Sequence, residues 1–75
     1  MDIAVDKSLL GEETEAEIIG WLVEDGSSVK QGQPICELET GKAMLELASP
    51  TTGVLRILLP KGSVVEPGSV VGSVG

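Results

Sequence analysis

Hydrophobic residues along the chain fall into short groups that Gly, Pro and Ser separate, and Val and Ile are prominent among them. This spacing is typical of β-strands joined by turns and not of helices. We therefore expect an all-β fold. The predicted strands span residues 2–5, 16–23, 28–29, 34–39, 43–49, 53–59, 64–65 and 70–74.

One segment, residues 9–17, has a helix-forming composition, and four of its nine residues are glutamates. Gly11 and Thr14 lie among these glutamates. We interpret the segment as an acidic loop that runs into a strand. The alternative is a short helical turn at this position.

The chain repeats its pattern at an offset of 36 residues. Gly-Ser-Ser-Val at 26–29, followed by Gly32, recurs as Gly-Ser-Val-Val at 62–65, followed by Gly68. Apolar positions on either side of these turns also correspond, and neither half alone could bury its apolar face. The repeat therefore predicts quasi-two-fold symmetry and two facing sheets, with turn glycines that adopt positive φ or allow close backbone approach. The alternative is a chance recurrence in glycine-rich turns.

Between the halves, residues 38–45 predict a β-hairpin whose turn is centred on Gly41 and Lys42. Counted outward from the turn, the predicted partners are Thr40 with Ala43, Glu39 with Met44, Leu38 with Leu45, Glu37 with Glu46 and Cys36 with Leu47. One face is then apolar, and the other carries the glutamates together with Met44. Gly41 suits the first central position of a type II′ turn, which requires positive φ. Lys42 becomes the most protruding residue of the ribbon.

Length and charge argue against several classes of function. A chain of 75 residues forms one small domain with little room for a deep cleft. Its formal net charge of −7 repels phosphate backbones, so nucleic acid is not an expected partner. The sequence has no His, Tyr or Phe, which removes the usual proton shuttle and most nucleophile-activating pairs. A stand-alone enzyme and a metal site are therefore disfavoured. No apolar run approaches the roughly 20 residues that a membrane-spanning helix needs.

Three single residues have both a structural and a functional interpretation. Lys42 could be only a solvated charge, but its small neighbours and the acidic ribbon give an approaching enzyme access to its amine, which favours acylation. Trp21 alternates with Ile19 and Val23, so we expect it to pack in the core and not to stack on a ligand. Cys36 lies on the apolar face of the hairpin and is expected to be a small buried side chain, not a reactive thiol.

The segment Glu39-Thr40-Gly41-Lys42-Ala43, together with the glycine turns before and after it, resembles the lipoyl domains of 2-oxo acid dehydrogenase complexes. The resemblance covers nearly the whole chain and implies a flattened β-barrel or sandwich of two four-stranded antiparallel sheets. It also implies that Lys42 carries lipoate in amide linkage, with the other four residues as its hairpin and recognition motif. The family's usual motif has Asp directly before the modified lysine, where this chain has Gly41. Related biotinyl domains have Met on both sides of their lysine, so the resemblance favours lipoate over biotin.

By this resemblance, residues 1–75 form a single lipoyl domain, expected to be the N-terminal module of a longer acyltransferase chain and not catalytic by itself. A lipoate ligase or lipoyl transferase would attach the cofactor. A thiamine-diphosphate-dependent 2-oxo acid decarboxylase would acylate it, the acyltransferase core would pass the acyl group to coenzyme A, and dihydrolipoyl dehydrogenase would reoxidise it. The expected location is the cytoplasm of a prokaryote or the mitochondrial matrix of a eukaryote, without membrane attachment.

Leu9, Leu10, Gly11, Glu12 and Glu13 lie where this family has an exposed loop near the modified hairpin, which is often implicated in docking to the decarboxylase. We expect the same role here, and the alternative is a solvated acidic loop. Two other functions stay open: a biotin carboxyl carrier domain, and an unmodified interaction module of the same fold. The ligase that modifies the hairpin lysine would separate them.

Overall fold

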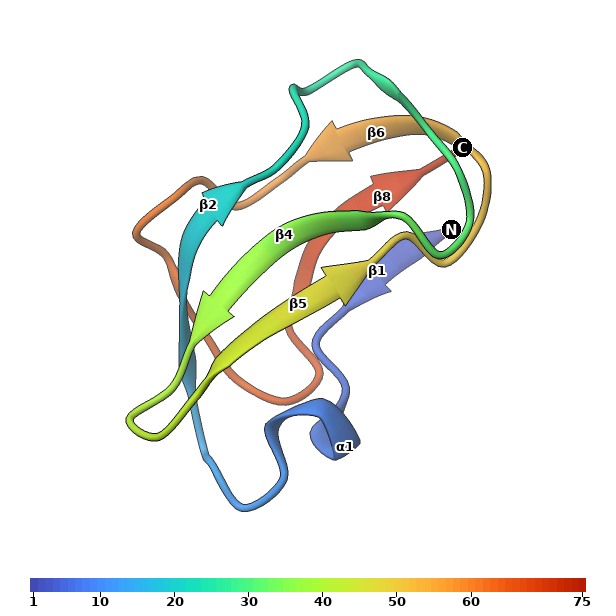
Figure 1. Cartoon of the computed structure of the whole chain (residues 1–75). Helices are drawn as coiled ribbons and strands as arrows, with labels where there is room; N and C mark the ends of the chain where they lie inside the picture. Colours follow the sequence, from blue (N-terminus) through green and yellow to red (C-terminus); the bar gives the residue numbers. More distant parts are fainter.

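The computed structural model describes residues 1–75 as eight β-strands and one short helix (Figure 1). The strands are β1 (Asp2–Ala4), β2 (Ala16–Trp21), β3 (Ser28–Val29), β4 (Pro34–Glu39), β5 (Met44–Ala48), β6 (Gly53–Ile57), β7 (Val64–Val65) and β8 (Val70–Val74), and the helix is α1 (Lys7–Leu10). Every predicted strand is present. β3, β4, β7 and β8 have the predicted bounds, and the other four are one or two residues shorter than predicted.

The strands form two four-stranded antiparallel sheets that face each other. The strand order is β1-β8-β6-β3 in one sheet and β5-β4-β2-β7 in the other. The sheets pack as a sandwich and are not joined into a closed barrel (Figure 1). The prediction of an all-β fold with two such sheets is therefore confirmed.

The two halves of the chain are interleaved, which confirms the internal repeat. Each sheet takes two strands from the first half, β1 to β4, and two from the second half, β5 to β8. Exchanging β1 with β5, β2 with β6, β3 with β7 and β4 with β8 converts the order of one sheet into that of the other. Neither sheet can therefore form from one half alone.

Turn glycines join the halves through equivalent backbone hydrogen bonds. The Gly26 N–H donates to the Leu55 carbonyl oxygen (2.8 Å), and the equivalent Gly62 N–H donates to the Ile18 carbonyl oxygen (2.7 Å). Gly26 has φ of 86° and Gly62 has φ of 93°. At such positive φ values the Cβ of any other residue would crowd its own backbone, which costs conformational energy. The second pair of turn glycines, also at positive φ, is Gly32 and Gly68. The predicted need for glycine at these turns is confirmed.

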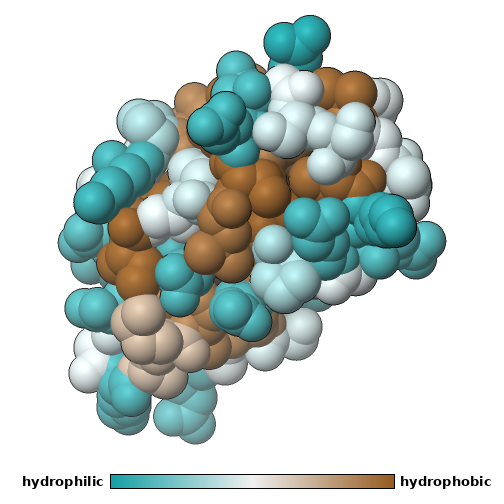
Figure 2. Space-filling model, turned by 45° about the horizontal axis from the view of Figure 1, so that its top comes forward, coloured by the Kyte–Doolittle hydropathy of each residue, from teal (hydrophilic) through white to brown (hydrophobic).

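The hydrophobic core lies between the sheets. Its buried apolar residues are Ile3, Val5, Leu10, Ala16, Ile18, Val29, Ile35, Cys36, Leu38, Leu47, Leu55, Val65, Val71 and Val74. Trp21 packs at the margin of this cluster, half-buried, and its indole N–H donates to the Leu59 carbonyl oxygen (2.9 Å). Its ring lies against Gly72, where an added Cβ would come within 3.4 Å of it. The prediction that Trp21 packs with the core is therefore confirmed. Not all apolar residues are buried, since some hydrophobic side chains are visible on the surface (Figure 2).

Helix α1 is a single turn where the sequence predicted a loop from residue 9 onward. The Asp6 side chain caps it by accepting a hydrogen bond from the Ser8 backbone N–H (3.0 Å), and Gly11, with φ of 62°, ends it. Leu10 is buried and anchors the turn to the core. The loop prediction is therefore wrong for residues 9 and 10, while residues 11–15 connect α1 to β2 without regular structure, as predicted. With four residues, α1 is far too short to be a membrane-spanning helix.

We expect Gly26→Ala to lower the free energy of unfolding by about 1 to 2 kcal/mol, because alanine at positive φ sets its Cβ against its own backbone. The space around that Cβ is open, so the cost reports on backbone conformation alone. Gly41→Ala is the matched control, since its added Cβ also meets no atom within 4 Å and Gly41 does not have positive φ. Urea unfolding followed by Trp21 fluorescence measures both, and equal midpoints for the two variants would refute the requirement for glycine.

Candidate functional site

The β4–β5 hairpin has the predicted register. Its observed pairs are Glu39–Met44, Leu38–Leu45, Glu37–Glu46 and Cys36–Leu47. Cys36 and Leu38 are fully buried on the inner face, whereas Glu39, Glu46 and Met44 are exposed on the outer face. Figure 1 shows the hairpin projecting at the end of the molecule that lies opposite the two chain termini. The ribbon thus holds its tip away from the body of the sandwich.

The turn itself is held by the side chain of Thr40. Its Oγ1 accepts hydrogen bonds from the backbone N–H groups of Lys42 (3.2 Å) and Ala43 (3.0 Å), and the Thr40 N–H donates to the Ala43 carbonyl oxygen (2.9 Å). Gly41 does not have positive φ, so the predicted type II′ turn is wrong. The threonine hydroxyl accepts hydrogen bonds from the N–H groups of the turn, so Gly41 does not need positive φ.

Sequence reasoning missed this role of Thr40. The available signal was a threonine directly before the two central residues of a turn, where its hydroxyl can reach N–H groups two and three residues ahead. This hydrogen bonding also affects how the turn would tolerate another residue at Gly41, the position at which lipoyl domains usually have Asp. Because Gly41 lacks positive φ and has open space beside it, the turn can accept an aspartate there without strain.

Lys42 is exposed at the tip of the ribbon between two small, exposed residues, Gly41 and Ala43. Its backbone N–H is bound to Thr40, so the turn fixes its Cα while its side chain extends from the surface. An amine placed in this way is open to an acylating enzyme and can reach the active sites of other proteins once it carries a long group. The site therefore fits a covalently attached carrier group better than a bound small molecule.

The loop at residues 9–13 lies beside this hairpin. The two segments line one surface hollow of about 270 Å³, to which the loop contributes Leu9, Leu10, Glu12 and Glu13, and the hairpin contributes Thr40, Lys42, Ala43 and Leu45. Leu10 is buried, and Leu9 is half-buried against the core. The leucines thus anchor the loop, which explains their presence in an otherwise acidic segment. Gly11 does not line the hollow and ends helix α1.

The opposite side of the hairpin is strongly acidic. A second hollow, of about 260 Å³, lies between the hairpin and β2, and its lining residues include Glu15, Glu17 and Glu39. Lys42 does not line it. Lys42 is therefore the one basic side chain beside two hollows that both carry glutamates, and only the first of them also carries leucines, which gives a partner a pattern of charge and apolar surface to recognise.

Cys36 is not the reactive group of this site. Burial, and secondarily the neighbouring Glu37 carboxylate, raise the pKa of the Cys36 thiol to about 11. Since the thiolate is the nucleophile, almost none of the reactive form exists at neutral pH. The prediction that Cys36 is an inert buried side chain is confirmed by its full burial and its raised pKa. No group of three or more potential ligands could hold a metal ion.

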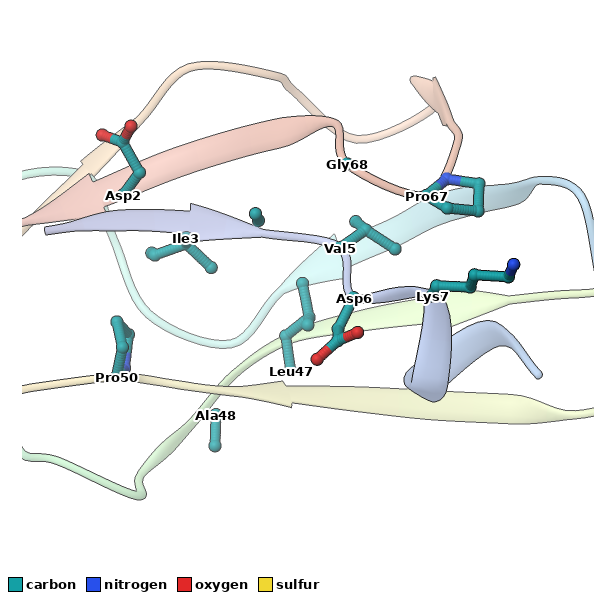
Figure 3. Close-up of a pocket in the computed structure, with 11 residues that line it drawn as sticks. Asp2, Ile3, Val5, Asp6, Lys7, Leu47, Ala48, Pro50, Pro67 and Gly68 are labelled. Carbon is teal, nitrogen blue, oxygen red and sulfur yellow. The ribbon is translucent and has the colours of Figure 1, made fainter.

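The largest hollow of the molecule lies elsewhere, between the outer edges of the two sheets. It has a volume of about 690 Å³ and is lined by β1 and β5 together with the turn at Pro67 and Gly68 (Figure 3). Its polar side chains are those of Asp2, Asp6 and Lys7, and Asp6 is already engaged as the cap of α1. None of its lining residues belongs to the hairpin tip, so this hollow does not form part of the candidate site.

Comparison with known proteins adds a family assignment. A family model described as "Biotin-requiring enzyme", whose name joins biotin and lipoyl, matches residues 4–74. A solution structure of the lipoyl domain of the 2-oxoglutarate dehydrogenase complex from Azotobacter vinelandii superposes with a TM-score of 0.78 at 24% identity and covers 100% of this chain and 95% of that one. This likeness supports the fold.

Curated relatives include proteins of two kinds. The succinyltransferase component of the 2-oxoglutarate dehydrogenase complex is 44% identical over 83% of this chain in Staphylococcus saprophyticus and 39% identical over 80% in Buchnera aphidicola. An acetyl-CoA carboxylase from Dictyostelium discoideum is 35% identical over 88% of the chain. The chain spans 15% of the length of each succinyltransferase and 3% of the carboxylase.

We expect Thr40→Val to loosen the hairpin tip, because it removes the acceptor of two backbone N–H groups while keeping the shape of the side chain. Amide hydrogen exchange at Lys42 and Ala43 should accelerate about fivefold, in line with a hydrogen bond worth about 1 kcal/mol. Thr40→Ser keeps the hydroxyl and should restore slow exchange. Unchanged exchange in the valine variant would show that the hydroxyl does not hold the turn.

Proposed function

Because the chain belongs to the family of biotin- and lipoyl-attachment domains, we propose that it is a lipoyl carrier domain and that Lys42 is its attachment residue. The observation that carries this proposal is the placement of Lys42, exposed at the tip of a hairpin whose turn is fixed by Thr40. The domain then acts by carriage, since it presents a reactive group to partners and needs no catalytic residues of its own.

The attached group would supply a dithiolane whose sulfurs accept acyl groups and electrons. The residues of this chain supply its position. Lys42 Nζ would form the amide, the Thr40 hydroxyl fixes the turn, and β4 and β5 connect the tip to the rigid core. Tethering raises the effective concentration of the group at each partner site, so an exposed, mobile arm on a rigid ribbon suits this role.

Two features favour lipoate over biotin. Lys42 is flanked by Gly41 and Ala43 instead of the two methionines of biotinyl domains, and Met44 lies one position too far along the chain. The relatives named as dihydrolipoyllysine-residue succinyltransferase components also have the higher sequence identity, 39% and 44% over 80% and 83% of the chain, against 35% over 88% for the acetyl-CoA carboxylase. A biotin carboxyl carrier domain is the alternative, and the carboxylase relative is the observation that supports it.

We further propose that residues 1–75 are one module of a longer dihydrolipoamide acyltransferase. The partners would be a lipoate ligase or lipoyl transferase, a thiamine-diphosphate-dependent 2-oxo acid decarboxylase, the acyltransferase core and dihydrolipoyl dehydrogenase, in the cytoplasm or the mitochondrial matrix. The loop at residues 9–13 is proposed to contact the decarboxylase. Its position beside the hairpin supports this role, because a partner that approaches the tip at Lys42 also comes close to the loop.

The attachment proposal is tested by measuring the intact mass of the domain after separate incubation with a lipoate ligase and a biotin ligase. We expect one lipoyl increment and no biotinyl increment, since the exposed tip and the flanking residues fit the lipoate ligase. Lys42→Arg should abolish the increment. Lys30→Arg is the matched control, because Lys30 is also an exposed lysine in a turn and should not affect modification.

A biotinyl increment would instead indicate a biotin carboxyl carrier domain of a carboxylase. The absence of any increment, with the fold intact by circular dichroism, would leave an unmodified module of the same fold and would reject the carrier proposal. An increment that persists in Lys42→Arg would place the attachment at another lysine.

The partner proposal concerns the acidic loop. We expect the double variant Glu12→Gln, Glu13→Gln to lower kcat/KM for reductive acylation by a 2-oxo acid decarboxylase by about threefold to tenfold at low ionic strength, because exposed interface charges mainly accelerate association. Lipoylation by the ligase should continue, which the mass increment verifies. Glu24→Gln, in the exposed turn after β2, is the control. Equal rates for the two variants at every ionic strength would remove the loop from the recognition surface.

A further inference from the structure

The two hollows beside the hairpin differ in a way that the carrier role alone does not require. They have similar volumes, about 270 Å³ and about 260 Å³. The first is lined by Lys42 itself, by Glu12 and Glu13, and by four hydrophobic residues, namely Leu9, Leu10, Ala43 and Leu45. The second excludes Lys42 and is lined by three glutamates, with only two hydrophobic residues. Only the first combines the attachment residue with an apolar surface.

We propose that the hollow between the loop at residues 9–13 and the hairpin is a resting site for the dithiolane end of the lipoyl group carried by Lys42. This inference rests on the proposed function and adds to it a second, non-covalent contact between the arm and its own domain. The occupant is fixed by the tether, because a group attached to a residue of the hollow reaches the hollow before it reaches any partner.

The chemistry of the hollow suits this occupant. The dithiolane and its hydrocarbon chain are apolar and uncharged, and they can pack against the side chains of Leu9 and Leu45, both of which are half-buried and partly accessible. A hollow just under 300 Å³ is at the lower limit of small-molecule sites, which fits one small ring and not a larger ligand. The hollow on the other side of the hairpin has no leucine, and only two of its seven lining residues, Ala16 and Val64, are hydrophobic.

The contact can be weak and still be populated. A short tether gives an effective concentration on the order of millimolar, so a dissociation constant in the same range holds the arm in the hollow for about half of the time. Such a contact would shelter the dithiolane between partners without trapping it. Since the same loop is the proposed decarboxylase contact, a partner that docks on residues 9–13 would cover the resting site and free the arm in one event.

The test compares methyl NMR spectra of the lipoylated and unmodified domain, with full modification established by mass. We expect shifts at the methyl groups of Leu9 and Leu45, together with nuclear Overhauser contacts from these methyl groups to the dithiolane protons. The exposed Val64, which lines the acidic hollow, and Leu58, which lines neither hollow, are the reference methyl groups and should not move. Leu9→Ala should at least halve the shift at Leu45, whereas Leu58→Ala should leave it unchanged.

A fully lipoylated domain whose Leu9 and Leu45 methyl groups neither shift nor contact the ring would overturn the inference and leave the carrier function standing. If neither ligase modifies Lys42, the carrier proposal fails, and the hollow is then tested with free lipoamide added to the unmodified domain. Saturable shifts at Leu9 and Leu45 in the millimolar range would support the site, and their absence would reject it. The lipoamide titration uses the unsubstituted protein, so it holds even where Leu9→Ala unfolds.

Discussion

The structure depends on a reciprocal set of backbone hydrogen bonds between its two halves. A turn glycine of each half, Gly26 or Gly62, donates its N–H to a strand carbonyl of the other half. Each sheet is built from two strands of each half, so the apolar faces of both halves are buried only when the whole chain is in place. Such a small domain forms its core only when the strands of the two halves are interleaved, an arrangement we call the interlock, because a half-length chain could not cover its own apolar surface. Both turns need positive φ, and glycine adopts this conformation without the steric cost that a Cβ would add.

The candidate site uses the rigidity that this interlock provides. β4 lies inside its sheet between β2 and β5, so one strand of the ribbon that ends at Lys42 is paired on both sides, while its other strand, β5, forms the edge of the sheet. Thr40 then removes the remaining freedom at the tip, and the lysine side chain becomes the first flexible element on the path from the core. Function in this domain therefore resides in presentation, with a fixed Cα and a mobile arm, and the absence of a deep cleft at the tip is consistent with it.

Much of this arrangement could be predicted from the sequence because it follows from polarity patterns. Strand positions, the repeat and the hairpin register all depend on which side chains must be buried, and a slip of one residue would have placed glutamates in the core. Two features could not be predicted in this way. The conformation of the turn at Gly41 is set by the hydroxyl of Thr40, which accepts hydrogen bonds from two backbone N–H groups. Glycine would also have allowed the type II′ turn, so the residue type at position 41 does not decide between the two. Helix α1 depends on one cap, Asp6, and one buried anchor, Leu10, in a segment too short to show a helical period.

The chain ends have a counterpart in the hairpin. Met1 and Val74 exchange two backbone hydrogen bonds, of 2.7 Å and 2.9 Å, at the edge where β1 pairs with β8. In the two-fold relation this pair corresponds to β5 and β4, so the termini occupy the position that the lysine hairpin occupies at the other end. The strand order of residues 1–75 is consequently circular, with the gap between β8 and β1 in the place of a hairpin turn. A circular permutant with linked termini and a new opening in another turn would keep every strand pairing and still present Lys42.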